Sequence, residues 1–263
     1  QAVALTGYNS LTYTVLISVK KPDGTLISTG SDRWFSNSLP ATGTYSVVVQ
    51  FTGGTLTGDF TLYYVAGGEG VSSGTMTSGT NATGSMAGDE MKSYELTAAA
   101  GQYLMVQVGA AWNSHIRVFK PDGTYWGGST TGRIDGALAT AGTYIVVVYA
   151  ANPSSTGAFT IYPLLGGGSV SEAKPLESGV PITNVSFDAN QLRSYQFEGF
   201  ANRGVRVHTG DFGANAHIWI FKPDGSYYWS QTANRIDVTL PATPASGTWT
   251  VAITTPNLGT TGT

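Results

Sequence analysis

The sequence predicts an all-β protein built from tandem β-sandwich modules, and two observations support that prediction. The first is composition: 35 of the 263 residues are glycine and only 11% are charged, whereas helical surfaces need many Glu, Lys and Arg residues. Short strands joined by turns rich in Gly, Pro, Asn and Asp have this composition instead. The second is an internal repeat, because Lys-Pro-Asp-Gly occurs three times, at residues 21–24, 120–123 and 222–225.

Other sequence features recur at the same spacing. A Gly-Thr-aromatic sequence begins at residues 43, 142 and 247, and an arginine occupies positions 33, 133 and 235. Self-similarity at a fixed period indicates a repeat architecture, here with a period of about 100 residues. We therefore expect three modules: module 1 over residues 1–67, module 2 over residues 68–167 and module 3 over residues 168–263.

Each module contains the signals of short antiparallel strands. In module 2, period-two alternation runs over residues 103–108, 115–119 and 159–162, and residues 144–149 form a nearly continuous β-branched run. In Pro-Asp-Gly, proline presets φ, aspartate bonds its own backbone and glycine takes a positive φ, so the motif predicts a turn. About seven strands per module suit a jelly-roll or immunoglobulin-like antiparallel sandwich. Residues 70–88, rich in Ser, Thr and Gly, are expected to form an extended, poorly packed lead-in to module 2.

The order of motifs in module 2 is similar to that of a known family. Residues 89–96 (Asp-Glu-Met-Lys-Ser-Tyr-Glu-Leu) precede Ala100-Gly101-Gln102, a strand, the Lys-Pro-Asp-Gly turn and Gly142-Thr143-Tyr144. This order resembles the pre-peptidase C-terminal domain family. Residues 39–45 (Leu-Pro-Ala-Thr-Gly-Thr-Tyr) also look like repeated modules of very long bacterial secreted proteins, including some with YD repeats. The resemblance covers essentially the whole chain. It implies a jelly-roll-like sandwich in a secreted or surface protein and no catalytic residue, with calcium or matrix-polymer binding in some relatives.

The first and last modules are expected to be incomplete. Val3 and Leu5 align with Leu104 and Val106, so module 1 lacks the strand that corresponds to residues 94–96. At the other end Gly262 corresponds to Gly157 and Thr263 is the last residue, so module 3 lacks its last strand. One interpretation is a window cut from a longer repeat protein. The other is strand complementation, in which a neighbouring chain supplies the missing strand.

A missing strand has a large energetic effect. Two buried large side chains contribute roughly 3–6 kcal/mol, comparable to a domain stability of about 5–15 kcal/mol. An open sheet edge also favours pairing with another chain, and head-to-tail pairing that does not close builds filaments. The candidate assembly ends are Val3, Leu5, Gly262 and Thr263, and the expected partner is a second copy of the chain.

Composition excludes several classes of function. A formal net charge of −3 is not the basic footprint of a nucleic-acid-binding protein. No apolar run approaches the roughly 20 residues that cross a bilayer. The absence of cysteine excludes a disulfide scaffold and Cys-based zinc sites.

Titratable residues give little indication of catalysis. His115 and His217 occupy the same repeat position, opposite the apolar face of their strands, and are expected to face solvent. Asp135 and Asp237 each lie two residues after an arginine, which predicts a local Arg–Asp pair. No nucleophile elbow or zinc-protease motif is present, so the sequence predicts no enzyme and no cofactor. Calcium bound by loop oxygens around Asp122 or Asp135 is a weaker alternative, because no EF-hand-type loop occurs.

Aromatic residues provide the candidate interface or ligand surface. They follow the second and third Pro-Asp-Gly turns or lie on the outward face of a strand: Tyr125, Trp126, Trp219, Tyr227, Tyr228 and Trp229. Three roles are open: cross-strand packing, an interface, or stacking on carbohydrate. Asn81 and Asn184 begin glycosylation sequons, which are common by chance.

The sequence favours a structural, non-enzymatic extracellular or cell-surface protein, a tandem β-sandwich subunit that assembles by strand complementation. The alternative is an accessory module of a secreted hydrolase, which would hold polysaccharide or protein on exposed aromatic side chains.

Overall fold

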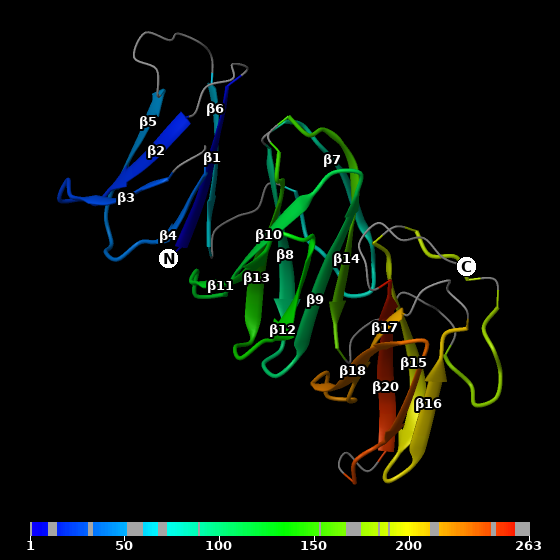
Figure 1. Ribbon diagram of the computed structural model, residues 1–263. Helices are drawn as coiled ribbons and strands as arrows, with labels where there is room; N and C mark the ends of the chain where they lie inside the picture. The colour runs from blue at the N-terminus through cyan, green and yellow to red at the C-terminus, as the bar shows by residue number, and fades with distance from the viewer. Residues whose placement is uncertain are drawn as a thin grey trace.

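The computed structural model describes residues 2–9, 15–30, 34–51, 60–67, 73–88, 90–152, 154–166, 175–183, 185–188, 190–210, 216–242 and 246–255. In these ranges the chain contains strands β1 to β20 and no helix. The strands pair antiparallel into sheets that pack as sandwiches, which confirms the predicted all-β sandwich fold. Strands β1–β6, β7–β14 and β15–β20 form three groups that follow one another along the molecule (Figure 1). These groups lie within modules 1, 2 and 3.

Module 2 has two four-stranded sheets. We call the sheet with the order β11-β10-β13-β8 the front sheet and the sheet with the order β12-β9-β14-β7 the back sheet, and we use the same names for the equivalent sheets of the other modules. The strands are β7 (Ala82–Met86), β8 (Met91–Ala98), β9 (Tyr103–Ala110), β10 (Ser114–Phe119), β11 (Tyr125–Ser129), β12 (Arg133–Ala137), β13 (Gly142–Ala150) and β14 (Gly157–Leu165).

Module 1 has three strands in each sheet. Its front sheet is β3-β2-β5 and its back sheet is β4-β1-β6. The strands are β1 (Ala2–Asn9), β2 (Val15–Lys20), β3 (Leu26–Gly30), β4 (Trp34–Ser38), β5 (Ser46–Phe51) and β6 (Phe60–Ala66). Among the described residues, no strand lies beside β5 where β8 lies beside β13, and none lies beside β6 where β7 lies beside β14.

Module 3 has a complete front sheet and a shorter back sheet. Its front sheet is β15-β20-β17-β18 and its back sheet is β16-β19. The strands are β15 (Leu192–Phe200), β16 (Gly204–His208), β17 (Ala216–Phe221), β18 (Tyr227–Ala233), β19 (Arg235–Thr239) and β20 (Ser246–Thr254). Within the described part of module 3, no strand lies beside β16 at the position that β14 takes beside β9.

The three Pro-Asp-Gly turns have the predicted chemistry. Their glycines have φ of +82°, +78° and +84°. In each turn the aspartate Oδ1 accepts hydrogen bonds from the backbone N, at 2.9 Å, and from the hydroxyl, at 2.7 Å, of the residue two positions later. These hydrogen bonds hold the pKa of all three carboxyls below their ordinary value.

The Gly-Thr-aromatic motif packs directly against these turns. A Cβ on Gly142, which has a φ of +136°, would lie 2.8 Å from the Pro121 ring, and the equivalent glycines of the other modules meet their prolines in the same way. In module 2 the aromatic side chain of this motif reaches the backbone just before its own strand, where the Tyr144 hydroxyl donates a hydrogen bond to the Thr140 carbonyl at 2.7 Å. This is the geometry of a tyrosine corner. The two motifs therefore recur together because they form one packing unit.

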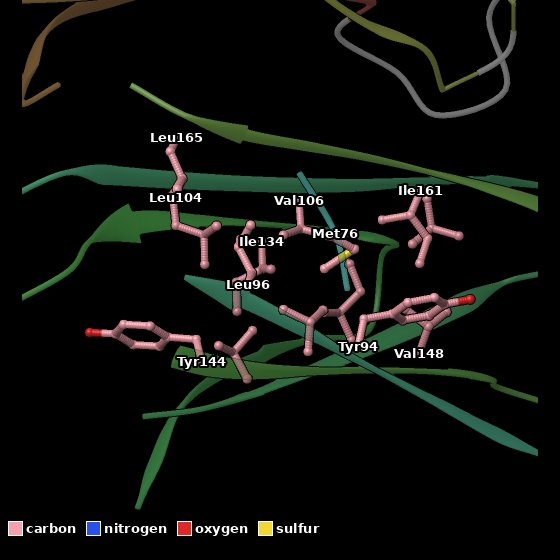
Figure 2. Close-up of a cluster of buried hydrophobic side chains, with 14 of the residues drawn as sticks. Met76, Tyr94, Leu96, Leu104, Val106, Ile134, Tyr144, Val148, Ile161 and Leu165 are labelled. Carbon is pink, nitrogen blue, oxygen red and sulfur yellow. The ribbon is translucent and has the colours of Figure 1, made fainter. Parts of the chain in front are cut away.

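The core of module 2 lies between its sheets (Figure 2). Leu104 and Val106 of the back sheet share one buried cluster with Leu96 and Val148 of the front sheet, and none of these side chains is more than 1% exposed. Alternate residues of each strand thus point into the sandwich, as the period-two pattern predicts.

Residues 73–88, the described part of the expected lead-in, pack more tightly than their composition predicts. Residues 82–86 form β7, and Met76 and Met86 are buried in the core at 3% and 2% exposure. The expectation of a poorly packed lead-in was therefore wrong. Two flexible methionine side chains and hydrogen bonds to the neighbouring strands, such as Met76 N to the Glu95 carbonyl at 2.7 Å, anchor a segment that is otherwise small and polar.

Candidate functional site: the seams between modules

Apolar side chains on the outer faces of the sheets bury module 1 against module 2. The back sheet of module 1 contributes Val65 and Tyr63, and the front sheet of module 2 contributes a larger set: Met91, Phe119, Ile145, Val147 and Tyr149. Phe119 and Val147 are fully buried. We call this contact seam 1–2. It explains the continuous apolar run in β13, because this strand is buried on both faces.

The contact between modules 2 and 3, seam 2–3, uses equivalent positions. Module 2 contributes Met105, Tyr162 and Leu164, and module 3 contributes Leu192, Trp219, Phe221 and Ala252. In the repeat alignment Leu164 takes the place of Val65, and Phe221 takes the place of Phe119. The back sheet of one module therefore packs on the front sheet of the next in both cases.

A glycine allows close approach at each seam. A Cβ on Gly67 would lie 2.4 Å from the carbonyl oxygen of Gly123, and a Cβ on Gly166 would lie 2.4 Å from that of Gly225. Both carbonyls belong to the Pro-Asp-Gly turn of the following module. The same turn that organises a module internally also contacts the module before it.

Tyr103 connects the two modules at seam 2–3. Its backbone N donates to the Gly225 carbonyl at 3.0 Å, and its ring centroid lies 5.6 Å from that of Phe221 and 5.2 Å from that of Tyr227. The hydroxyl donates to Asp135 Oδ2 at 2.7 Å. Burial, followed by this hydrogen bond, raises the pKa of the Tyr103 phenol, so the group remains a neutral donor.

An indole, an imidazole and a guanidinium meet at the same seam. Trp219 is 3% exposed, and its ring stacks on His217 with centroids 3.8 Å apart and planes 16° apart. The guanidinium carbon of Arg133, from module 2, lies 5.6 Å from the Trp219 ring centroid, within the range of a cation–π contact. Burial lowers the pKa of His217, and the charge of Arg133 lowers it further.

Seam 2–3 also buries a hydrogen-bonded polar pair. Gln107 is 1% exposed and Thr254 is 0% exposed. Gln107 Nε2 donates to Thr254 Oγ1 at 3.0 Å, and the threonine hydroxyl donates to the Gln191 carbonyl at 2.8 Å. A buried amide without a hydrogen-bond partner is costly. This pair therefore favours the one relative position of modules 2 and 3 in which Gln107 meets Thr254.

Three of the six candidate aromatic residues pack inside the molecule, Trp219 completely and Trp126 and Tyr228 partly. Trp219 is buried in seam 2–3. Trp126 packs against the core of module 2, and Tyr228 packs against the core of module 3. Tyr228 meets Trp249 edge-on with ring centroids 5.3 Å apart. The sequence left open cross-strand packing, an interface or stacking on carbohydrate, and in this structure these three side chains contribute to internal packing.

The other three aromatic residues are exposed. Tyr125 is 40% exposed and accepts a hydrogen bond from Arg117 at 3.0 Å. Tyr227 is 41% exposed beside Tyr103, and Trp229 is 46% exposed on β18. The six residues therefore do not form one platform, and Trp229 is the most exposed of them.

The predicted Arg–Asp pair forms in module 3. Arg235 Nε lies 3.2 Å from Asp237 Oδ2, and Arg206 also donates to this carboxylate. Module 2 has a different arrangement, in which Asp135 accepts the tyrosine hydroxyl described above and Arg133 lies over the indole. Seam 2–3 supplies these alternative partners, and sequence spacing alone does not show them.

The two equivalent histidines are half-buried, so the expectation that they face solvent was wrong. His115 meets Tyr149 edge-on with ring centroids 5.2 Å apart, and burial lowers the pKa of its imidazole. His217 stacks on Trp219 as described. Both lie on strand faces that the seams cover, which alternation within one module does not reveal.

Each of the two outermost sheet faces carries a charged residue at a position that is apolar in a seam. The position that holds Phe119 in module 2 holds Lys20 in module 1, and Lys20 is exposed. On the back sheet of module 3, the position of Met105 holds Arg206, which forms the ion pair with Asp237.

Apolar side chains are exposed at one edge of module 1. Val47, Phe60, Leu62 and Tyr64, on β5 and β6, are 39%, 49%, 37% and 56% exposed. The module 2 counterparts of Val47, Phe60 and Leu62, at positions 146, 159 and 161, are at most 3% exposed, because β7 and β8 cover them. We call these four residues the open edge of module 1.

Two of the four candidate assembly ends, Val3 and Leu5, lie away from this edge. Val3 and Leu5 are in β1, which pairs with β4 on one side and β6 on the other, so their strand is not an edge. Gly262 and Thr263 lie outside the described residues. In the described part of module 1 the edge strands are β3 and β5 in one sheet and β4 and β6 in the other.

Cofactor, membrane and glycosylation signals are sparse. In the ranges given above, no group of three or more His, Asp or Glu side chains could hold a metal ion. The same ranges contain no helix long and apolar enough to cross a membrane. Asn81 is exposed just before β7, whereas Asn184 lies outside the described residues.

The fold and its seams define the class of this molecule as an all-β tandem sandwich protein. No family model matches the chain, and no curated protein matches it. One similar solved structure is that of Aeromonas hydrophila PliG, a periplasmic inhibitor of g-type lysozyme. It is 26% identical, and the match covers 33% of this chain and 84% of that chain with a TM-score of 0.29.

Proposed function

We propose that this chain is a non-catalytic structural protein of the extracellular space or cell surface. Its modules act as a rigid spacer, and it joins other polypeptides by strand complementation at an open sheet edge. The observation that supports this proposal is the repeated seam. Domains joined by a linker move relative to one another unless their interface is extensive and apolar, and both seams bury large apolar side chains at equivalent positions.

The charged residues on the outermost faces favour edge pairing over face stacking in assembly. A further seam between two copies would bury either Lys20 or the Arg206–Asp237 ion pair, and the desolvation of such charges is strongly unfavourable. Unpaired strand edges carry no such cost and readily accept another strand.

Distance measurements across seam 2–3 test the rigid-spacer proposal. The chain contains no cysteine, so Thr97→Cys and Glu198→Cys, at exposed positions in modules 2 and 3, give two unique spin-label sites. Pulsed electron paramagnetic resonance should give a narrow distance distribution, and Phe221→Asp should broaden it. A broad distribution in the chain without Phe221→Asp would contradict the proposal.

A second candidate function, a binding accessory for polysaccharide, is favoured by the exposure of Tyr227 and Trp229. Aromatic faces stack on sugar rings. Retention on insoluble polysaccharide that Trp229→Ala abolishes, and that Trp126→Phe leaves unchanged, would support this function against the purely structural one.

A further inference from the structure

We propose that the free edge of β18 in module 3 pairs with the same strand of a second copy of this chain, antiparallel and about a twofold axis. The inference deepens the proposed function and rests on it, because it names one pairing edge and the partner of that edge. The two four-stranded front sheets would then join into one continuous sheet, with the two copies of β18 side by side at its centre.

The edge of β18 is open for a reason internal to the module. β18 forms one margin of the front sheet (Figure 1), and among the described residues only β17 pairs with it. In module 2, which packs against a module on either side, the equivalent strand β11 likewise pairs only with β10 in the described part of the chain. Stacking of modules in series therefore does not cover this edge.

The sequence of β18 lacks the features that keep an edge strand from pairing. Charged residues and proline block edges, and glycine weakens a strand. β18 reads Tyr-Tyr-Trp-Ser-Gln-Thr-Ala and contains none of these, whereas β11 is shorter and contains Gly127 and Gly128. Of the edge strands that the structure describes in modules 2 and 3, β18 alone has neither a charged residue nor a glycine.

The exposed side chains of β18 suit a protein interface. Trp229 is 46% exposed and Tyr227 is 41% exposed, and Gln231 and Thr232 are exposed as well. Interface cores are enriched in Trp and Tyr and depleted of charged residues. Trp229 takes the position of Gly127 in the strand register, so module 3 presents a large aromatic side chain where module 2 has none.

A second copy of β18 is a compatible partner for this strand. The β-bulge lies opposite its first residues, and residues 229–233 pair in regular register. In an antiparallel pair centred near Ser230, no charge faces another, and the two copies of Trp229 lie diagonally across the pair, within reach of aromatic side chains. Trp229 pairs with the core residue Ile220, so the two indoles would meet on the face that continues the core.

Self-association through one strand is expected to be weak. Twofold pairing of a surface with itself is the commonest form of protein association. An interface of one strand from each copy belongs to the small class, below roughly 1,200 Å². We therefore expect dimers to form at roughly 10–100 μM.

Sedimentation equilibrium of the 263-residue chain tests the inference. The chain should pass from monomer to dimer between about 5 and 500 μM, and hydrogen exchange should become slower in β18, but not in β11, as dimers form. Trp229→Ala should weaken the dimer at least about tenfold. Tyr125→Ala, which removes an exposed aromatic side chain from β11, should leave it within about twofold.

Charge exchange at one position separates self-pairing from any other contact. Gln231 is exposed next to the proposed axis, so Gln231→Lys places two like charges together in a dimer, and Gln231→Glu does the same. Each variant alone should be monomeric, and their equimolar mixture should form a heterodimer, seen by native mass spectrometry. Pairing of β18 with a different segment would not be restored in this way. The same exchange at Thr97, which is exposed on β8, should leave every dimer intact.

Three results would overturn the inference. The first is a monomer throughout the concentration range with β18 exchanging freely, and the second is a dimer that both Gln231 variants retain. The third is a monomeric chain whose retention on polysaccharide is abolished by Trp229→Ala, which would assign this edge to the accessory function. None of these results bears on the rigid spacer, which the spin-label distances test independently.

Discussion

Alanine replacement of two equivalent phenylalanines tests whether module 1 is open in solution. Phe60 and Phe159 occupy the same position on β6 and β14. They differ in environment, because Phe159 is 3% exposed and Phe60 is 49% exposed. The two substitutions remove the same atoms. Any difference in the free energy of unfolding that they cost therefore measures the burial that β7 and β8 give to Phe159.

The expected magnitudes follow from burial. Phe→Ala in a closed core costs about 3–5 kcal/mol through lost transfer free energy and a residual cavity, and we expect this range for Phe159→Ala. About half of the Phe60 residue surface is already exposed, so Phe60→Ala should cost about 1.5–2.5 kcal/mol.

Hydrogen exchange with mass spectrometry measures the two effects separately, because it reports local opening in each module. Phe60→Ala should accelerate exchange in β6 roughly 10- to 70-fold, and Phe159→Ala should accelerate exchange in β14 more than about 100-fold. Equal acceleration would refute the reasoning, since it would mean that Phe60 is covered in solution.

The seams provide the remaining predictions. Gly67→Ala and Gly166→Ala should each cost about 1–3 kcal/mol through overpacking against a turn carbonyl, seen as uncoupled melting of adjacent modules by calorimetry; unchanged coupling would contradict the close approach. Gln107→Leu removes the amide that bonds Thr254 and should cost about 1–3 kcal/mol by urea denaturation; no loss would show that the pair does not stabilise the seam. The folded-state pKa of His217 lies below its unfolded value, so the unfolded chain binds more protons and stability should fall as pH drops below about 6.5. His217→Gln should remove that part of the pH dependence of Tm, and an unaltered slope would exclude it.

Sequence reasoning predicted the features that depend on neighbouring residues in the chain. The Pro-Asp-Gly turns follow from the chemistry of three adjacent side chains, and strand alternation places Leu104 and Val106 in a core. These interactions are local or repeat within each module, so one copy of the repeat supports the interpretation of the others.

The seams were not predicted, because they join outward faces of different modules. Alternation assigns Trp219 to the outer side of its strand, which is correct, but does not show that module 2 covers that side. One usable signal was present: the β-branched run of residues 144–149 lacks polar alternation, as expected of a strand buried on both faces.

The charged residues on the outermost faces also make the order of the modules part of the structure. If modules 1 and 2 exchanged places, Lys20 would enter a seam and Phe119 would face water. Shuffled or duplicated modules of this chain should therefore fail to dock, whereas a variant that keeps the module order and alters only surface loops should keep both seams. Position along the molecule is thus encoded in the outward residues of β2, β10 and β17, while the inward residues of the same strands are nearly interchangeable.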